Sequence, residues 1–346
     1  MESPESWFHR RATFYVESQI LFHLNQVGVL KLLNQGGAHT AQQVADTLRL
    51  ESGPTDALLD YIFEVDDLLD RDQEGRYSLS EFGKRVVGRF SDMKADGGEQ
   101  SINMFDVRVG AYGPVWQNLT KMLSGNGRYG RDFHREGRYA ENGVFKLAMK
   151  FWNSLAEHVE ELGTDRAVEV GLTTGLVEKL GEKYPQHVLY GLDRNKEAIE
   201  SNAASASAKA IKNIRWLHGD YFDPESWCKD VDAGGQGLIF SLHFHELMAQ
   251  GEAKFVKVLR ALKNALPNWR LVAFEQPRLP HGEKASITET LWLYSQSNIL
   301  IHHLIGNGKI LSRDAWIDLG YQAGCRNVTD RACNYLGYRA FLFQFN

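Results

Sequence analysis

The sequence predicts an α/β protein in which a mainly helical N-terminal region precedes an open, mostly parallel β-sheet. From about residue 165 onward, short apolar runs alternate with helical stretches, and this alternation is typical of a sheet with helices on both faces. Before that point, residues 7–90 show helical periodicity followed by a hairpin pattern. The strand-like runs are AVEVG, HVLYGLD, IRWLHGD, GLIFSL and LVAFEQP.

The composition fits a globular protein with a sizeable core. The chain has 346 residues, of which 43% are apolar and 24% charged. A net charge of -5 disfavours general affinity for nucleic acid or an anionic membrane. The cysteines Cys228, Cys325 and Cys333 are too few and too far apart for a disulfide framework. With neither a signal-peptide pattern nor a long apolar run, we expect a cytoplasmic protein without a nucleic-acid or membrane partner.

Residues 7–90 predict three helices followed by a two-stranded wing. Thr40 can cap the helix AQQVADTL, because its hydroxyl can accept from the exposed amides of the first turn. The run LLDRDQEGRYSLS alternates around a turn at Gly75, which predicts the wing. A helical apolar stripe comprises Phe14, Ile20, Leu21, Leu24, Val29 and Leu32. The presumed recognition helix, TDALLDYIFEVDD, is acidic, whereas phosphate contacts need Lys or Arg, so a dimerisation and lid module is favoured over a DNA reader.

Three regions follow from these patterns. We expect a winged-helix dimerisation domain over 1–95, a helical linker or lid over 96–160, and the sheet domain over 161–346. Gly and Arg are dense in GNGRYGRDFHREGRY, as in a long connection, and the apolar spacing after it predicts one helix at about 141–162.

A ligand-binding turn is predicted where the first strand of the sheet domain ends. The run AVEVGLTTG places Gly171 and Gly175 between a strand and a helix, where the lack of a Cβ lets the backbone turn sharply beside a ligand. About twenty residues on, the next strand ends in Asp193, whose carboxylate can accept hydrogen bonds from both ribose hydroxyls. A nicotinamide enzyme would more often have GxGxxG, but Leu172 takes the middle position.

The third strand of this domain ends in HGDYF. Asp220 can bind the exocyclic amine of adenine there, and Tyr221 or Phe222 can flank the ring. Three such signatures at the ends of successive strands favour a nucleoside-bearing cofactor over a chance arrangement of turns and surface acids.

These residues resemble the motifs of the class I S-adenosylmethionine-dependent methyltransferases. AVEVGLTTG is similar to the family's first motif, E-x-G-x-G-T-G, apart from Leu172 and Thr173, where small residues are usual. GLD resembles the second motif and GDYF the adenine motif. With the N-terminal module and the stretch IGNGKILSRDAWIDLGYQAGC, the resemblance extends over nearly the whole chain to the winged-helix small-molecule O-methyltransferases.

The resemblance implies a Rossmann-like domain with a mostly parallel seven-stranded sheet, and S-adenosylmethionine as cofactor. It also implies a small-molecule substrate and a homodimer interlocked through the N-terminal module. The cofactor contacts that it implies are Glu169, Gly171, Thr173, Gly175, Asp193, Arg194, Gly219, Asp220, Tyr221, Phe222 and Ser241.

Candidates for the chemistry follow the strand GLIFSL. The next residues, HFHEL, place His243, His245 and Glu246 at the carboxyl end of a strand, which is the edge where open α/β sheets bind ligands. An O-methyltransferase of this group often has a histidine near here as general base, which takes the proton from a phenol or alcohol. His243 and His245 are therefore both catalytic candidates.

A second pair of histidines allows metal chemistry. NILIHHLIG places His302 and His303 in an apolar helix, which by the resemblance lines the substrate pocket. Two imidazoles and one carboxylate make a facial triad with positions open for a chelating substrate such as an α-keto acid. The pattern resembles the metal-dependent α-keto acid C-methyltransferases, which make β-methyl amino acid precursors. It implies one metal ion (Fe, Zn, Co or Ni) held by His245, Glu246 and His302, with His243 and His303 as alternatives.

Three functions remain open from the sequence. The first is metal-dependent C-methylation of an α-keto acid, such as 2-ketoarginine or phenylpyruvate, at its β-carbon. The second is metal-free O-methylation of a phenolic or hydroxylated metabolite, with His243 or His245 as base. The third is a ligand-binding regulator without catalysis, which the acidic recognition helix and the intact cofactor signature disfavour.

Overall fold

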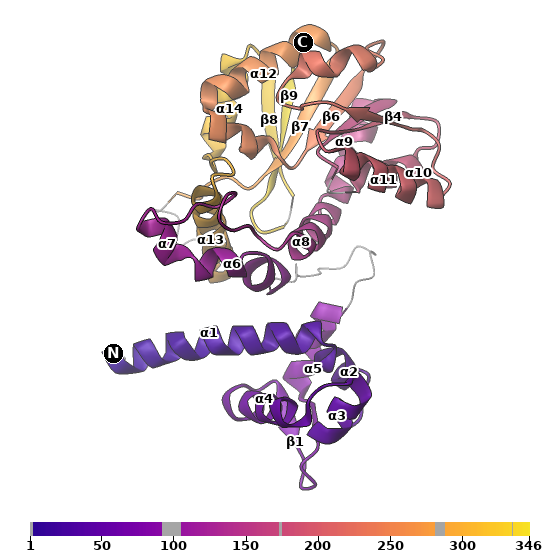
Figure 1. Cartoon of the computed structure of the whole chain (residues 1–346). Helices are drawn as coiled ribbons and strands as arrows, with labels where there is room; N and C mark the ends of the chain where they lie inside the picture. The colour runs from indigo at the N-terminus through magenta and orange to yellow at the C-terminus, as the bar shows by residue number, and fades with distance from the viewer. Residues whose placement is uncertain (1–2, 92–104, 173–174, 281–287, 334) are drawn as a thin grey trace. The chain divides into compact units, whose positions relative to one another are not determined.

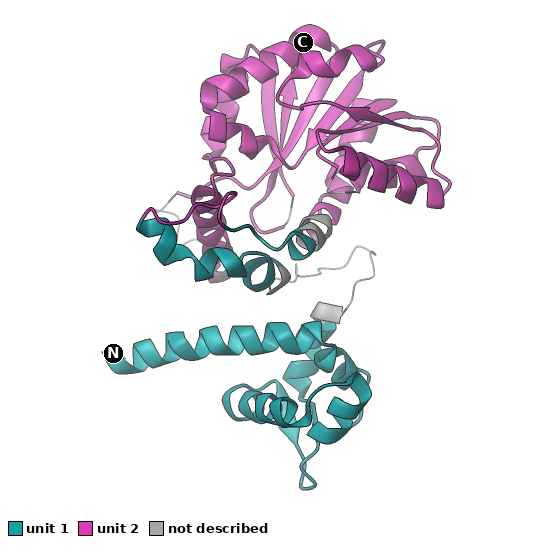
Figure 2. Cartoon of the chain, viewed as in Figure 1, with its two compact units in different colours: residues 1–124, 133–143 teal, residues 125–132, 144–346 magenta. Residues whose placement is uncertain are grey.

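The structure of the chain is a computed structural model that describes residues 3–91, 105–172, 175–280, 288–333 and 335–346. The chain divides into two compact units (Figure 2). Unit 1 comprises residues 1–124 and 133–143, and unit 2 comprises residues 125–132 and 144–346.

Unit 1 begins with helices and a short hairpin around a common apolar core, as the winged-helix pattern predicts. Thr40 forms the expected cap: its hydroxyl accepts from the Gln43 amide at 3.2 Å, and the Gln43 side chain accepts from the Thr40 amide. The wing is antiparallel, and its turn contains Gly75 at a φ of 72°. The elements are α1 (Pro4–Gln26), α2 (Val29–Asn34), α3 (Ala41–Leu48), α4 (Ser52–Val65), β1 (Leu69–Arg71), β2 (Tyr77–Leu79) and α5 (Glu81–Ser91) (Figure 1).

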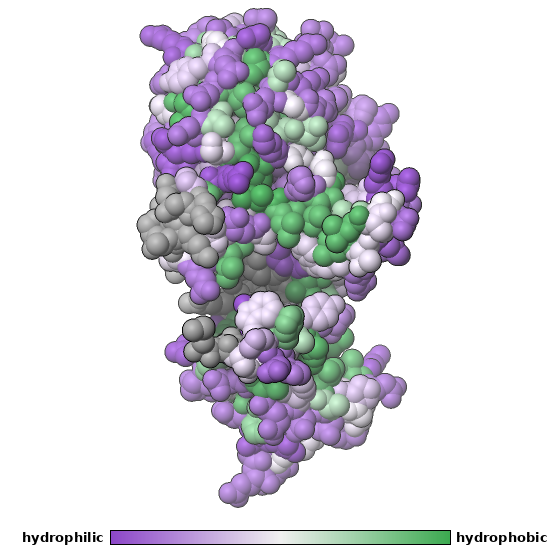
Figure 3. Space-filling model, turned by 90° about the vertical axis from the view of Figure 1, so that its left-hand side faces the viewer, coloured by the Kyte–Doolittle hydropathy of each residue, from purple (hydrophilic) through white to green (hydrophobic). Residues whose placement is uncertain are grey.

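Among the described residues, helix α1 contributes to the core of unit 1 through its second half. Leu24 is buried there, whereas Phe14, expected on the same buried stripe, is 49% exposed. The first half also exposes Trp7, Phe8 and Tyr15. Figure 3 shows how apolar residues interrupt the hydrophilic surface of the chain. The helical period was correct, but the length of helix that the core covers was not readable from it.

The region between the wing and the sheet is built of short helical segments in its described part. Its described elements are η1 (Phe105–Ala111, a π-helical segment), α6 (Gly113–Gln117) and α7 (Leu119–Leu123). The single helix expected at 141–162 is instead two helices, α8 (Gly137–Met149) and α9 (Trp152–Leu162). Between them, the amides of Lys150 and Phe151 donate to carbonyls three residues back, which closes a turn, and Phe151 stacks on Phe274 with ring centroids 5.3 Å apart.

Unit 2 contains the mostly parallel seven-stranded sheet that the sequence predicts, in the order β5-β4-β3-β6-β7-β9-β8. The first five strands of this order are parallel, and β9 is antiparallel to both of its neighbours. The strands are β3 (Arg166–Val170), β4 (Val188–Asp193), β5 (Ile214–His218), β6 (Gly237–Ser241), β7 (Trp269–Glu275), β8 (Asn327–Ala332) and β9 (Arg339–Gln344). Because the chain order reverses at β3, the neighbouring carboxyl ends of β3, β4 and β6 are where a ligand is expected.

Helices cover both faces of this sheet: Figure 1 shows α9, α10 and α11 on one side and α12 and α14 on the other. Large aromatic side chains, among them Phe255, Trp269, Trp316, Phe341 and Phe343, fill the core. None of the helices that the structure describes is long and apolar enough to span a membrane. The remaining elements are α10 (Leu176–Lys183), α11 (Lys196–Ala208), η2 (Pro224–Ser226), η3 (Cys228–Asp230), η4 (Phe244–Gln250), α12 (Glu252–Ala265), α13 (Glu289–Ile305) and α14 (Arg313–Gln322).

Candidate active site

The carboxylate of Asp193 closes the turn after β3. It lies at the end of β4, and its two oxygens accept from the backbone amides of Leu172 at 2.9 Å and Asn195 at 2.8 Å. The side chain is buried within unit 2. Each carboxylate oxygen keeps a further lone pair, so these backbone bonds orient Asp193 and leave it able to accept from a diol.

Glu169 is a buried carboxyl group with an unused oxygen. It is 1% exposed, and its Oε2 accepts from the Val177 amide at 2.8 Å at the start of α10, while its Oε1 has no hydrogen-bond partner among the described residues. Burial raises the pKa of Glu169 to about 8; the Val177 amide opposes this, and the charges of Glu178 and Asp193 add to it. A buried polar atom without a partner is costly, so this oxygen fits a ligand that brings a polar group.

The glycine turn is tight because His243 packs against it. Gly171 has a φ of 85°, and a Cβ at this position would lie 2.4 Å from Cδ2 of His243. Gly175 also has a positive φ and begins α10, whereas Thr173 lies outside the described residues. Ser241 holds the backbone of His243 close to the end of β3, since its hydroxyl donates to the Val170 carbonyl at 2.8 Å and accepts from the His243 amide at 2.9 Å.

The turn after β5 exposes one predicted cofactor residue and buries two. Asp220 is exposed, and its Oδ1 accepts from the Phe222 amide at 2.9 Å. Tyr221 and Phe222 are both buried. The Tyr221 hydroxyl donates to Oε2 of Glu246 at 2.8 Å, and the guanidinium carbon of Arg194 lies 5.6 Å from the centroid of the Tyr221 ring.

Gly219, which precedes this turn, is buried where a Cβ would come within 3.0 Å of the Cβ of Trp227. The predicted cofactor residues Glu169, Asp193 and Asp220 therefore lie at or just after the carboxyl ends of adjacent strands, in the order that the sequence implies. This donor set fits S-adenosylmethionine: carboxylates for ribose and adenine, and a buried unpartnered oxygen nearby.

His245 is held by a carboxylate that the sequence did not pair with it. Glu275 at the end of β7 accepts twice, from the His245 backbone amide and from the His245 ring Nδ1, both at 2.9 Å. Because a carboxylate only accepts, Nδ1 carries the proton and Nε2 is left as the basic nitrogen. Burial lowers the pKa of His245, but the charges of Glu275 and Glu246 and the Glu275 hydrogen bond outweigh it, so that the pKa is raised.

The sequence contained a signal for this pair. The run LVAFEQP ends its strand with an acid, and β7 lies next to β6, whose end leads into His245. The order of the strands is not visible in the sequence, so the sequence does not predict this pairing.

His302 also lies beside His245. The two ring centroids are 4.5 Å apart in an edge-to-face arrangement, and Nδ1 of His302 donates to the Asn307 carbonyl at 2.9 Å. The turn after α13 contacts the segment that bears His245, because a Cβ at Gly308 would overlap the His245 carbonyl oxygen. His303, by contrast, is exposed, which favours His302 as the member of this pair that belongs to the site.

Both carboxylate oxygens of Glu246 already accept hydrogen bonds from other side chains. Its Oε1 accepts from the Asn307 amide at 3.3 Å and lies 3.4 Å from Nδ1 of His243, and its Oε2 accepts from Tyr221. Burial raises its pKa, but His243, His245 and Tyr221 lower it by more, so the carboxylate is ionised. Among the described residues, no three His, Cys, Asp or Glu side chains are grouped to hold a metal ion, so the expected triad of His245, Glu246 and His302 is not assembled.

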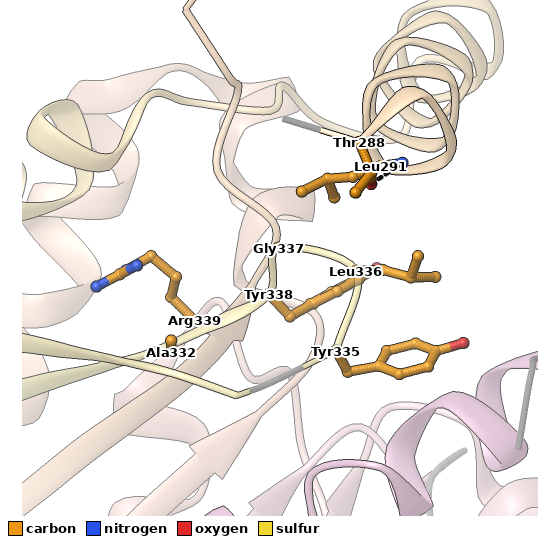
Figure 4. A pocket seen from close by; sticks show the side chains of 8 residues that line it. All are labelled: Thr288, Leu291, Ala332, Tyr335, Leu336, Gly337, Tyr338 and Arg339. Atoms are coloured by element: carbon orange, nitrogen blue, oxygen red, sulfur yellow. Dashed lines mark hydrogen bonds between the residues drawn. The ribbon is translucent and has the colours of Figure 1, made fainter. Parts of the chain in front are cut away.

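A separate hollow of about 270 Å³ lies at the loop between β8 and β9 (Figure 4). Its one charged side chain, Arg339, pairs with Asp330. The described residues that line it include no His, Asp, Glu or Cys side chain. Its lining residues are Thr288, Leu291, Ala332, Tyr335, Leu336, Gly337, Tyr338 and Arg339.

The fold is similar to those of solved methyltransferase structures over nearly the whole chain. A putative O-methyltransferase from Nostoc punctiforme has a TM-score of 0.71 and 15% identity, with 99% of each chain covered. Human N-acetylserotonin methyltransferase in complex with SAM has a TM-score of 0.69 and 16% identity, with 99% of this chain and 98% of that chain covered. No family model and no curated protein sequence matches the chain.

A third similar structure is that of a pericyclic reaction enzyme. Its TM-score is 0.65 at 15% identity, with 100% of this chain and 90% of that chain covered. At such low identities the comparison shows the fold, which is that of the class I methyltransferases with an N-terminal helical region. The activity has to be argued from the site.

The His245–Glu275 pair predicts a measurable pKa change. The substitution Glu275→Gln removes the charge that raises the pKa of His245 while burial still lowers it. We therefore expect the pKa of His245 to fall below its value in the parent protein, as followed by NMR titration of the histidine rings. His158, which bonds to the Ser154 carbonyl on α9, is the internal control and should not shift. An unchanged pKa of His245 in Glu275→Gln would contradict the pairing of these two side chains.

Proposed function

We propose that the chain is an S-adenosylmethionine-dependent O-methyltransferase of a small hydroxylated molecule, with His245 as general base. The observation that supports this most is the double hydrogen bond from His245 to Glu275, at the sheet edge where the predicted cofactor residues also lie. The structural neighbours include a putative O-methyltransferase and a methyltransferase bound to SAM, which favours the same activity.

Different residues of the site would bind the cofactor and transfer the proton. Glu169, Asp193 and Asp220 would hold the cofactor, which when bound supplies an electrophilic methyl group on a sulfonium sulfur. Nε2 of His245 would take the proton from the substrate hydroxyl, so that the oxygen becomes a better nucleophile. Glu275 keeps the ring in the required tautomer and stabilises the imidazolium that forms. Glu275 is buried and His245 is partly buried, which limits competition from water.

A second candidate function is metal-dependent C-methylation of an α-keto acid. The 4.5 Å separation of the His245 and His302 rings favours it, because two neighbouring imidazoles can share a metal. Three observations weigh against it: the hydrogen bonds of Glu246 to Tyr221 and Asn307, and the pairing of Nδ1 of His245 with Glu275. The two functions differ in the atom that receives the methyl group and in the need for metal.

The cofactor site is tested by binding alone. Asp193→Ala removes an acceptor for the ribose, and a hydrogen bond to a charged group contributes about 1.5–3 kcal/mol, so affinity for S-adenosylmethionine should fall roughly ten- to a hundredfold. Calorimetry on both proteins measures this. Asp314→Asn, an exposed carboxylate on α14, is the matched control and should bind like the parent. If the parent protein binds neither S-adenosylmethionine nor its demethylated product, the proposal is wrong.

The reaction is tested by its pH dependence and its product. Because the pKa of His245 is raised, turnover should increase with pH through a midpoint above about 6.5, the ordinary histidine value, and His245→Asn should lower the rate by about 10²- to 10⁴-fold. A panel of phenols, catechols, phenylpyruvate and 2-ketoarginine, with and without chelator, supplies the substrates. Mass spectrometry and NMR should locate the methyl on oxygen, with activity resistant to chelator. Methyl on carbon together with chelator sensitivity would favour the second function.

We also propose that the protein is a homodimer formed through unit 1. The exposed Trp7, Phe8, Phe14 and Tyr15 of α1 support this, since a stable dimer needs an apolar interface of more than about 2,000 Å² in total. Light scattering should give twice the mass of one chain. The double variant Trp7→Glu, Phe8→Glu should reduce the measured mass to that of one chain. Tyr321→Glu, at a similarly exposed position on α14, should leave the dimer intact. A parent protein of single-chain mass at micromolar concentration would refute this.

A further inference from the structure

We propose that Glu246 is a positioning residue that couples the cofactor side of the site to its substrate side. The inference rests on the proposed function and adds to it a coupling between cofactor binding and the turn after α13. Glu246 lies in the first turn of η4 (Phe244–Gln250), directly after the general base.

One carboxylate connects three turns that are distant in the sequence. Tyr221 belongs to the turn after β5, His243 to the turn after β6, and Asn307 to the turn after α13. The Tyr221 hydroxyl and the Asn307 amide donate to different oxygens of Glu246, at 2.8 and 3.3 Å, and the His243 ring lies 3.4 Å from Oε1. A largely buried ionised carboxylate makes strong hydrogen bonds. A movement of one partner therefore changes the hydrogen bonds that the carboxylate makes with the others.

Two of these turns contact the proposed cofactor site. Tyr221 follows Asp220 directly, and its ring packs near the guanidinium of Arg194, which itself follows Asp193. The His243 ring lies so close to Gly171 that a Cβ at this position would overlap the ring. Binding of the cofactor at Asp193 and Asp220 would therefore fix the phenol that Glu246 accepts from.

The third turn belongs to the substrate side. Asn307 donates its side-chain amide to Glu246, and its backbone carbonyl accepts from Nδ1 of His302. The glycines on either side of it, Gly306 and Gly308, have φ values of 64° and 92°. Gly308 approaches the backbone of residues 245–246 so closely that any Cβ would overlap it, so the turn can lie against this segment because the residue is glycine. The Asn307 hydrogen bond to Glu246 holds the turn there, with the His302 ring beside His245.

The test measures this coupling without a substrate. Hydrogen–deuterium exchange of peptides that cover residues 302–308 is compared with and without S-adenosylhomocysteine. Binding of the product should slow exchange there by at least about fivefold, the lower end of ordinary coupling between sites. Tyr221→Phe keeps the ring and removes only the hydroxyl that donates to Glu246, and Glu246→Gln removes the charge of the acceptor. Each variant is compared at a product concentration that saturates it by calorimetry, and the slowing at 302–308 should then fall below about twofold.

A matched control separates coupling from local stability. Glu252→Gln removes an exposed ion pair of 3.4 Å to Lys309, which follows the same turn but does not reach Tyr221. It should retain the full effect of the product on residues 302–308. If Glu246 had only a structural role, Glu246→Gln would speed exchange equally with and without product and leave their ratio intact.

The outcomes distinguish this inference from the proposed function. Failure of the parent protein to bind S-adenosylhomocysteine would overturn the function and the inference together. Binding with unchanged exchange at 302–308, or with the same slowing in Tyr221→Phe as in the parent, would overturn the coupling alone. Loss of the slowing in both variants, with Glu252→Gln like the parent, would support it.

Discussion

The parallel register of β4, β3, β6 and β7 is the constraint on which the site depends. Parallel neighbours end at the same edge of a sheet, so each strand delivers the residue at its end to one place. Glu169, Asp193 and Glu275 arrive there from three strands, and His245 arrives from the segment after a fourth. The hydroxyl of Ser241 ties the end of β6 to that of β3 and keeps this edge in register.

Carboxyl groups gathered at one edge would repel each other unless their surroundings differed. Glu169 is buried, and its burial together with the charges of Glu178 and Asp193 raises its pKa to about 8. Glu246 is also largely buried, but Tyr221 and the two histidines keep it ionised. Differences of this kind between nearby acids are typical of sites that bind and turn over ligands, because each acid can then perform a different task.

The fold leaves the reaction open, since the similar structures include both methyltransferases and a pericyclic reaction enzyme. What distinguishes the candidate reactions is the environment of a few side chains. A histidine whose Nδ1 is bonded to a carboxylate is well suited to take a proton through Nε2. An acid whose oxygens already accept from a phenol and an amide is poorly suited to bind a metal.

The sequence by itself determined the elements and the place of the site. Alternating apolar runs marked the first five strands of unit 2, Thr40 marked a helix start, and Gly171, Asp193 and Asp220 marked successive strand ends, because these signals are local in the chain. Only the tertiary structure decided the partners. Glu275 meets His245 across 30 residues, and Glu246 meets Asn307 across 61, because strand order and the path of α13 bring them together. Such pairings depend on long-range packing, which leaves no periodic trace in the sequence. The sequence therefore suggested Glu246 as a metal ligand beside His245, whereas the structure pairs His245 with Glu275.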